Sequence, residues 1–411
     1  MKRKNEKGSY RKLAIKNISW VWLTRVATRA VSVVRTAITA RLLSPSAFGI
    51  FGIASLGLGS LEVFTETGIN IFLVQEKNTD RYTNSAWIIS IVRGILISLL
   101  LILTAPIITL FFNSSEAYHY ILILSVVPFI KGFINPSIVN FQKDLKLHRE
   151  FWYRSIIFTI ESIFTVVFTL YFKTPMGLAA GLISGALVEV FISHVFISPK
   201  PKIEFNAIKI KKIFHNGKWV TAYGIFNYLS EELDNAVVAK ILGATSLGIY
   251  DLAYRFSYLP ISEIGDVVSR VVFPLYVKII EDKRRLRSTF LKTSFVISLF
   301  VLLAGVILFV FANQIVTIVL GQKWIDAVPI LKILILYGVC RGSFGPFSAL
   351  FLALNKQRYI AFITSARVAT LLLTIIPLTV LYGLTGSALS AVISAIVEIP
   401  ITSYYAYKLL R

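Results

Sequence analysis

Long apolar runs follow one another along almost the whole chain, and they constrain this sequence more than any motif. Each run is close to the roughly 20 residues that an α-helix needs to cross a bilayer. The twelve runs fall at about residues 14–40, 47–74, 84–112, 118–141, 151–172, 176–198, 219–242, 245–277, 289–320, 327–354, 359–381 and 383–407. Only 16% of the 411 residues are charged, whereas soluble chains carry about a quarter. We therefore predict an all-α polytopic membrane protein with twelve transmembrane helices.

Lys and Arg residues outside the runs are distributed unequally between alternate loops. The N-terminal tail and every second loop after it hold 29 of them, and the other loops hold 4. Basic residues accumulate in cytoplasmic loops, so both termini are expected in the cytoplasm. The same bias explains the net charge of +22 without a nucleic-acid partner. No cleavable signal peptide is expected.

The two halves of the chain repeat each other. Asn17, Trp20 and Gly49 align with residues 216, 219 and 248 at an offset of 199 without a gap. Further on, residues 147–149 align with residues 354–356 at an offset of 207. Six spans in each half make this a parallel repeat, and transporters of this kind alternate access by rocking one half against the other. We expect a basic tail (1–13) and two parallel six-helix lobes (14–205 and 206–411) around a central cleft.

Charged residues inside the runs are costly, at about 2.5–3.5 kcal/mol each near the bilayer centre on insertion scales. The runs hold 21 of them, and 13 lie in runs 1, 2, 7 and 8. These are Arg25, Arg29, Arg35, Glu62, Glu66, Glu231, Glu232, Asp234, Asp251, Arg255, Glu263, Asp266 and Arg270. Runs 1–2 and 7–8 are repeat partners, so we predict that these charges line one cleft.

The arginines of the first run are the candidate substrate site. Arg25, Arg29 and Arg35 fall within about a 120° arc of one helix. Guanidinium groups match phosphate geometry and stay charged when they are partly desolvated. They could bind a phosphate or pyrophosphate group. Alternatively, they form ion pairs with Glu62, Glu66 or Asp234 that only hold the structure together.

The acidic residues of these runs are candidates for coupling or gating. Glu62 and Glu66 are one helical turn apart. They could bind a proton or Na⁺, or they could neutralise the first-run arginines. We favour neutralisation. Asp234 aligns with Arg35 in the repeat, and an ion pair between them could latch one conformation. The full candidate set for coupling or gating is Glu62, Glu66, Glu231, Asp234, Asp251 and Arg255.

Motifs for bound cofactors are not found. The four histidines and the single Cys340 are scattered without metal-ligand spacing. The chain has no G-x-x-x-x-G-K-[ST] loop, so it is not expected to hydrolyse ATP. We expect no metal and no cofactor other than a coupling ion, H⁺ or Na⁺.

Several short motifs resemble a known transporter family. They are Arg41-Leu-Leu-Ser-Pro-Ser-Ala-Phe-Gly49, Glu62-Val-Phe through Gly68, Leu73-Val-Gln75, Tyr228-Leu, Asp234-Asn235, Leu242-Gly243, Leu247-Gly-Ile-Tyr250, Ala253-Tyr-Arg255, Pro260 and Arg270-Val-Val-Phe-Pro274. This pattern is similar to Wzx-type oligosaccharide flippases, in the polysaccharide transporter branch of the multidrug/oligosaccharidyl-lipid/polysaccharide exporter superfamily. Within it, the exporters of lipopolysaccharide, teichuronic acid and colanic acid are the most similar branch.

The resemblance implies flipping of an undecaprenyl-pyrophosphate-linked oligosaccharide from the cytoplasmic to the outer leaflet of the bacterial inner membrane. It also implies partners among membrane lipids and polysaccharide polymerases. A drug/cation antiporter of the same superfamily is the alternative, but three first-run arginines disfavour cationic cargo. An enzyme of glycan assembly would need a large catalytic loop, and a non-transporting scaffold would not explain the costly charges.

Overall fold

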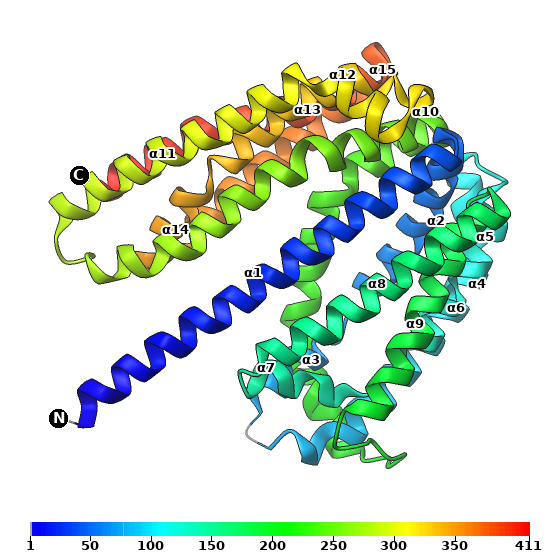
Figure 1. Cartoon of the computed structure of the whole chain (residues 1–411), viewed down its shortest axis with the longest axis horizontal. Coiled ribbons are helices and arrows are strands. Elements are labelled where there is room, and N and C mark those ends of the chain that lie inside the picture. The colour runs from blue at the N-terminus through cyan, green and yellow to red at the C-terminus, as the bar shows by residue number, and fades with distance from the viewer. Residues whose placement is uncertain (1, 77) are drawn as a thin grey trace. The chain divides into compact units, whose positions relative to one another are not determined.

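The computed structural model describes the backbone of residues 2–76 and 78–411 (Figure 1). Side chains are described in these ranges except at residues 2–18, 214–219, 222, 223, 259, 263, 264, 266–268, 270 and 271. Glu263, Asp266, Arg270 and the side chains of the predicted basic tail therefore lie outside the described side chains. The described backbone is almost entirely helical.

The chain forms two compact units, Met1–Glu231 and Glu232–Arg411, each described by itself below. Helices of the first unit are α1 (Lys2–Leu42), α2 (Pro45–Phe64), α3 (Ile69–Gln75), α4 (Asp80–Phe112), α5 (Ala117–Leu124), α6 (Val126–Lys131), η1 (Pro136–Val139), α7 (Asn140–Lys143), α8 (Leu147–Phe172), α9 (Met176–Phe196) and the beginning of α10 (Ala207–Lys278). The second unit holds the rest of α10, α11 (Lys283–Val310), α12 (Ala312–Gln314), the π-helix η2 (Ile315–Leu320), η3 (Gln322–Trp324), α13 (Ala327–Gly342), α14 (Gly345–Ala353) and α15 (Gln357–Leu410).

Membrane-spanning length and hydropathy characterise most of these elements. Among the described residues, eight helices are long and apolar enough to cross a bilayer. The segments Ala117–Lys131 and Pro136–Lys143, bent by 72°, together make a ninth candidate. Helix α1 falls outside this set because Arg25, Arg29 and Arg35 interrupt its apolar stretch. The structure therefore confirms a helical, polytopic membrane protein, and the count of twelve spans stays a prediction.

Glycines interrupt the two longest helices. Helix α10 contains 72 residues and α15 contains 54, which would be about 108 and 81 Å long if straight. Gly243 (φ 81°, ψ −179°) and Gly383 (φ 61°, ψ −139°) have non-helical angles and break them. A positive φ is available to glycine at little steric cost. Both positions coincide with boundaries predicted between apolar runs.

The internal repeat is visible in the backbone, with one correction to its register. Leu145 and Asn355 both have positive φ, 56° and 55°. Two residues after each, α8 begins at Leu147 and α15 begins at Gln357. The preceding N–H groups of Lys146 and Lys356 donate to residues five positions earlier, both at 2.8 Å. The offset here is therefore 210, and the predicted 207 was wrong because apolar sequences match each other in several neighbouring registers.

Within the first unit, α1 packs along α8, and α8 packs along α9 (Figure 1). Three glycines one turn apart on α9 make the second contact close. A Cβ at Gly177 or Gly181 would lie 2.4 Å from Thr169 Cα or 2.7 Å from Thr165 Cα. Small residues at such spacing let two backbones approach. The third glycine of the series, Gly185, faces the Glu161 side chain.

Candidate functional site

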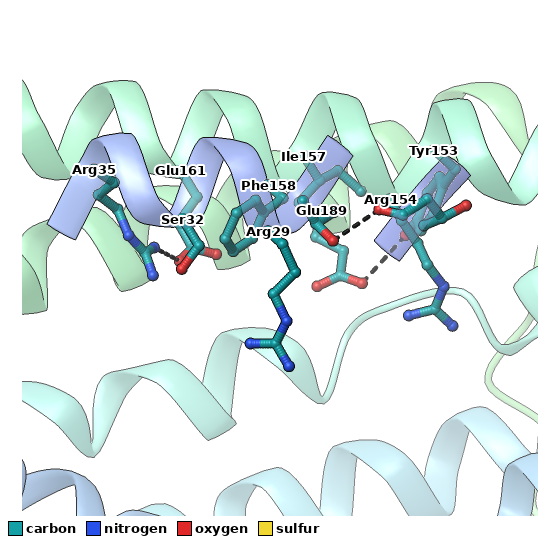
Figure 2. A pocket seen from close by; sticks show the side chains of 11 residues that line it. Arg29, Ser32, Arg35, Tyr153, Arg154, Ile157, Phe158, Glu161 and Glu189 are labelled. Carbon is teal, nitrogen blue, oxygen red and sulfur yellow. Dashed lines mark hydrogen bonds and ion pairs between the residues drawn. The ribbon is translucent and has the colours of Figure 1, made fainter. Parts of the chain in front are cut away.

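An open groove of about 430 Å³ lies between α1, α8 and α9 in the first unit (Figure 2). Most of its lining residues are polar or charged. They are Thr24, Thr28, Arg29, Ser32, Arg35, Tyr153, Arg154, Ile157, Phe158, Glu161 and Glu189. A polar groove is unexpected between helices this apolar, and polar groups inside membrane segments usually serve transport or binding.

Helical periodicity in α1 produces one wall of the groove. Thr24, Thr28, Ser32 and Arg35 are spaced by four, four and three residues, so they share one face. The hydroxyl of Thr28 donates to the carbonyl oxygen of Thr24 at 2.8 Å, which satisfies it within the helix. Sequence reasoning found the arginines of this face and missed the hydroxyls, although the same spacing would have revealed them.

Arg35 is held on two sides by α8. Its Nη1 lies 2.9 Å from Glu161 Oε1, and its guanidinium carbon lies 5.0 Å from the centre of the Phe158 ring (Figure 2). Both charged side chains are about one-fifth exposed, 19% and 18%. The ion pair therefore borders the groove and is open to an entering group.

The partner of Arg35 corrects a prediction. We favoured Glu62 and Glu66 as partners of the first-run arginines, but the carboxylate described at Arg35 belongs to Glu161. Glu66 instead pairs with Arg93 of α4 at 3.3 Å, and its Oε1 accepts the N–H groups of Thr67 and Gly68 at 3.1 and 3.0 Å. It thereby supports the break between α2 and α3. The side chain of Arg93 also donates to the Glu62 carbonyl oxygen at 2.6 Å.

The other two first-run arginines differ from each other. Arg29 is exposed and lines the groove, and its side chain extends away from the Arg35–Glu161 pair (Figure 2). Arg25 is half-buried and does not belong to the lining in the described part of the chain. The structure therefore brings Arg29 and Arg35 together at one groove and leaves Arg25 outside its lining.

Two further charged residues complete the groove. The Nε of Arg154 lies 2.7 Å from Glu150 Oε1, one turn earlier on α8. The hydroxyl of Tyr153 lies 3.5 Å from Glu189 of α9 (Figure 2). The lining thus carries three guanidinium groups and two carboxylates, and Glu150 beside it neutralises Arg154.

The candidate gating residues of the second unit have partners inside that unit. Asp234 is 6% exposed and accepts hydrogen bonds from the Tyr250 hydroxyl and the Asn235 N–H, both at 2.9 Å. Asp251 pairs with Arg255 at 2.9 Å, one turn away. Glu231 is exposed at the end of the first unit. Arg35 and Asp234 belong to different units, and the latch between them stays a prediction.

A buried charge network in the second unit received no role from sequence reasoning. Arg341 Nη1 donates to both carboxylate oxygens of Glu398, at 3.1 and 3.0 Å. Arg367 Nε lies 3.8 Å from the same carboxylate. Arg367 and Glu398 are only 5% and 3% exposed. In the sequence, the network could have been suspected from its three charged residues, which lie in the apolar runs 10, 11 and 12.

Tyrosines pack beside this network. The rings of Tyr254, Tyr258 and Tyr337 lie 5.0 to 6.1 Å from one another. Among the described side chains, no group of three or more His, Cys, Asp or Glu residues could hold a metal ion. The second unit therefore contains an ionic and aromatic cluster in which Arg367 and Glu398 are buried and Arg341 is 22% exposed.

The sequence matches one protein family and is similar to proteins of polysaccharide biosynthesis. A family model described as "Polysaccharide biosynthesis protein" matches residues 38–329. The lipopolysaccharide biosynthesis protein WzxC of Escherichia coli K12 is 25% identical over 349 residues, which cover 84% of this chain and 71% of WzxC. The teichuronic acid biosynthesis protein TuaB of Bacillus subtilis 168 is 24% identical over 363 residues, covering 85% and 73%.

Solved transporters share the fold. The lipid II flippase MurJ in an inward closed conformation matches with a TM-score of 0.76 at 18% identity, covering 94% of this chain and 87% of MurJ. An inward-facing multidrug resistance transporter of the MATE family matches with a TM-score of 0.68 at 16% identity, covering 93% and 95%. At these identities the likeness establishes the architecture only.

Proposed function

Because this chain belongs to the polysaccharide biosynthesis protein family, we propose that it is a flippase for a polyprenyl-pyrophosphate-linked oligosaccharide. It moves this lipid from the cytoplasmic to the outer leaflet of the bacterial cell membrane and supplies surface polysaccharide synthesis. The names of WzxC, TuaB and MurJ describe proteins of lipopolysaccharide, teichuronic acid and lipid II pathways. The function proposed for this chain is transport and not catalysis.

The observation that carries the proposal is the groove between α1, α8 and α9. It combines the guanidinium groups of Arg29 and Arg35 with the hydroxyls of Thr24, Thr28 and Ser32. Arginine forks bind phosphate oxygens in pairs and are less hydrated than ammonium groups. Hydroxyl groups both donate and accept hydrogen bonds, as sugars require. A polar head group can therefore enter here while its hydrocarbon tail stays in the surrounding lipid.

The ion pair between Arg35 and Glu161 sets how the groove responds to its cargo. At 2.9 Å and one-fifth exposure, Arg35 is neutralised while the groove is empty of anions. A pyrophosphate group competes with the carboxylate for the guanidinium. Arg29, which points away from this pair (Figure 2), makes the first contact. The gating roles of Glu62, Glu66, Glu231, Asp234, Asp251 and Arg255, with H⁺ or Na⁺ as coupling ion, belong to the same proposal.

We further propose twelve spans in two six-helix lobes (14–205 and 206–411), with both termini in the cytoplasm. The breaks at Gly243 and Gly383 support dividing α10 and α15 into two spans each. Reporter fusions after Lys173 and Lys323 should be active outside the cytoplasm, and fusions after Lys211 and Arg284 inside it. One reversed pair would contradict this topology.

The transport proposal is tested in a bacterial host that lacks its own flippase. The chain should restore surface polysaccharide, and after reconstitution it should expose a lipid-linked oligosaccharide at the opposite leaflet of vesicles. The variant Arg29→Ala, present at normal membrane abundance, should lose most of this activity. If the chain instead gives resistance to cationic drugs and moves no lipid-linked oligosaccharide, the antiporter alternative holds.

A further inference from the structure

The linker between α9 and α10 presents large apolar side chains outside the membrane-spanning segments. Helix α9 ends at Phe196 and α10 begins at Ala207. Ile203, Phe205 and Ile208 are 84%, 76% and 83% exposed. Single exposed apolar residues are common on proteins. Three within six residues form a patch, and exposed apolar patches often mark an interaction site. We call residues 200–212 the basic linker; this range includes the first six residues of α10.

Hydrogen bonds hold the basic linker in place. The Asn84 side-chain amide donates to Glu204 Oε2 at 2.7 Å, and its Oδ1 accepts the Lys202 N–H at 2.9 Å. Just before the linker, Asn135 Nδ2 donates to the carbonyl oxygens of Ile197 and Pro199 at 3.2 and 3.1 Å. The apolar side chains are thus displayed by a tethered backbone.

Apolar residues of the same segment already fill the protein interior. Ile213 is fully buried in a cluster with Phe72 and Tyr82, and Ile210 packs against that cluster. Ile203, Phe205 and Ile208 are not part of this cluster and are at least 76% exposed. The outward apolar residues therefore need a partner outside the described contacts of the chain.

The charge of the basic linker identifies the chemistry of that partner. It contains Lys200, Lys202, Lys209, Lys211 and Lys212, with Glu204 as its one acidic residue. The hydrogen bond from Asn84 and the charge of Lys209, 3.6 Å away, lower the pKa of Glu204. The carboxylate is therefore ionised at neutral pH, and it stays engaged by its partners. A positive surface with exposed aliphatic and aromatic side chains fits an anionic lipid interface.

We infer that the basic linker is an interfacial lipid-binding element. Ile203, Phe205 and Ile208 enter the zone between head groups and acyl chains. Lys200, Lys202 and Lys211 contact lipid phosphates, whereas Lys209 and Lys212 pair with Glu204 and Glu76 at 3.6 and 2.9 Å. The linker starts four residues after α9, a candidate span, ends. Seven extended residues reach at most about 25 Å, so Ile203 lies within about this distance of the end of α9. This inference does not depend on the flippase proposal. In the proposed topology the basic linker lies at the cytoplasmic leaflet.

Site-specific labelling of the full chain tests the inference. The chain has one cysteine, Cys340, so Cys340→Ser gives a background for Phe205→Cys carrying an environment-sensitive fluorophore. The matched control is Asp144→Cys, on a turn of the same unit. Both proteins are reconstituted into vesicles of phosphatidylcholine alone and of phosphatidylcholine with phosphatidylglycerol.

The label at residue 205 should emit at shorter wavelength than the label at residue 144. It should be quenched by nitroxide lipids rather than by iodide, and more strongly in vesicles with phosphatidylglycerol. Replacing Lys200, Lys202 and Lys211 by Gln should remove the difference between the two vesicles while the blue shift remains.

Equal iodide quenching at residues 205 and 144 in both vesicles would overturn the inference. Equal lipid quenching with and without phosphatidylglycerol would overturn the role of the lysines. A label that becomes shielded only after a membrane protein extract is added would assign the patch to a protein partner and overturn lipid binding.

Discussion

The groove of the first unit and the charge network of the second unit place the same chemical groups in opposite settings. Arg35 and Glu161 are each about one-fifth exposed and lie beside hydroxyl groups at an open groove. Arg367 and Glu398 are at most 5% exposed and lie in a core with tyrosines. An exposed pair can exchange its partner for a ligand, whereas a sealed pair cannot do so without unfolding its surroundings. The buried Arg367–Glu398 contact is therefore expected to be structural, and the partly exposed Arg35–Glu161 pair is the one that a ligand could open.

The largest effect is expected from Glu398→Gln in the charge network of the second unit. It leaves the buried guanidinium group of Arg367 and the partly exposed one of Arg341 without their shared carboxylate. Removing one member of a buried charge set costs about 3–5 kcal/mol, so little folded protein should reach the membrane. Fluorescence-detected size-exclusion chromatography after heating measures this loss.

Glu150→Gln is the matched control for Glu398→Gln. It removes the carboxylate of a pair in which Arg154 is 53% and Glu150 14% exposed, and pairs that solvent reaches contribute about 0–1 kcal/mol. Equal thermal stability of the two variants would show that the two settings do not differ as argued.

Arg29→Ala should produce the second-largest effect, and it should act on transport. Arg29 is exposed in the groove, so its loss should remove anion contacts, and membrane abundance is measured alongside export to separate this effect from folding. Hydrogen bonds to charged groups contribute about 1.5–3 kcal/mol, which corresponds to a roughly ten- to hundredfold loss of export. Arg29→Lys should retain part of the activity because an ammonium group cannot bind two phosphate oxygens in a planar fork.

Arg25→Ala is the comparison on the same helix. Its side chain lies outside the described groove lining, so its effect on export should be smaller than that of Arg29→Ala. Surface polysaccharide per amount of membrane protein is the measurement. If both alanine variants export normally, the groove is not the anion site.

Gly185→Ala should have an intermediate effect that a second substitution can reverse. The new Cβ would lie 2.7 Å from Glu161 Cγ and 2.9 Å from its Oε2, so the Glu161 side chain must shift, which we expect to weaken its pair with Arg35. Overpacking of this kind costs about 1–3 kcal/mol, and export should fall. Adding Glu161→Asp shortens the side chain and should restore part of both stability and export.

Gly181→Ala separates positioning from helix packing. Its Cβ would lie 2.7 Å from Thr165 Cα, which is backbone and cannot be shortened. Glu161→Asp should therefore give no rescue of Gly181→Ala. Equal rescue of both glycine variants would mean that Gly185 serves packing alone and does not position Glu161.

Tyr250→Phe in the second unit should act on stability and leave the groove unchanged. It removes one of two described hydrogen bonds to Asp234 and keeps the ring in place. A buried carboxylate that loses one donor costs about 1–3 kcal/mol, visible as a lower unfolding temperature. Tyr258→Phe provides the control, since Tyr258 makes ring contacts near the same network. An unchanged unfolding temperature for Tyr250→Phe would remove Asp234 from the set of structurally held charges.

The amino-acid sequence by itself determined the class of protein and one wall of its groove. Apolar runs and loop charges are local properties, so they predict membrane helices without any tertiary contact. The spacing of Arg29 and Arg35 in α1 likewise follows from helical periodicity. The family resemblance, confirmed by the model that matches residues 38–329, also rested on short local motifs.

Only the tertiary structure decided which charges meet. Glu161 reaches Arg35 across 126 residues, and Glu398 reaches Arg341 across 57. Several carboxylates in the spans were equally plausible partners by sequence, and periodicity does not choose among residues on different helices. The repeat register of 210 at α8 and α15 needed backbone angles for the same reason. In apolar helices many pairings bury similar surface, so close approach of the backbones at Gly177 and Gly181, and the room left at Gly185, select the pairing that is observed.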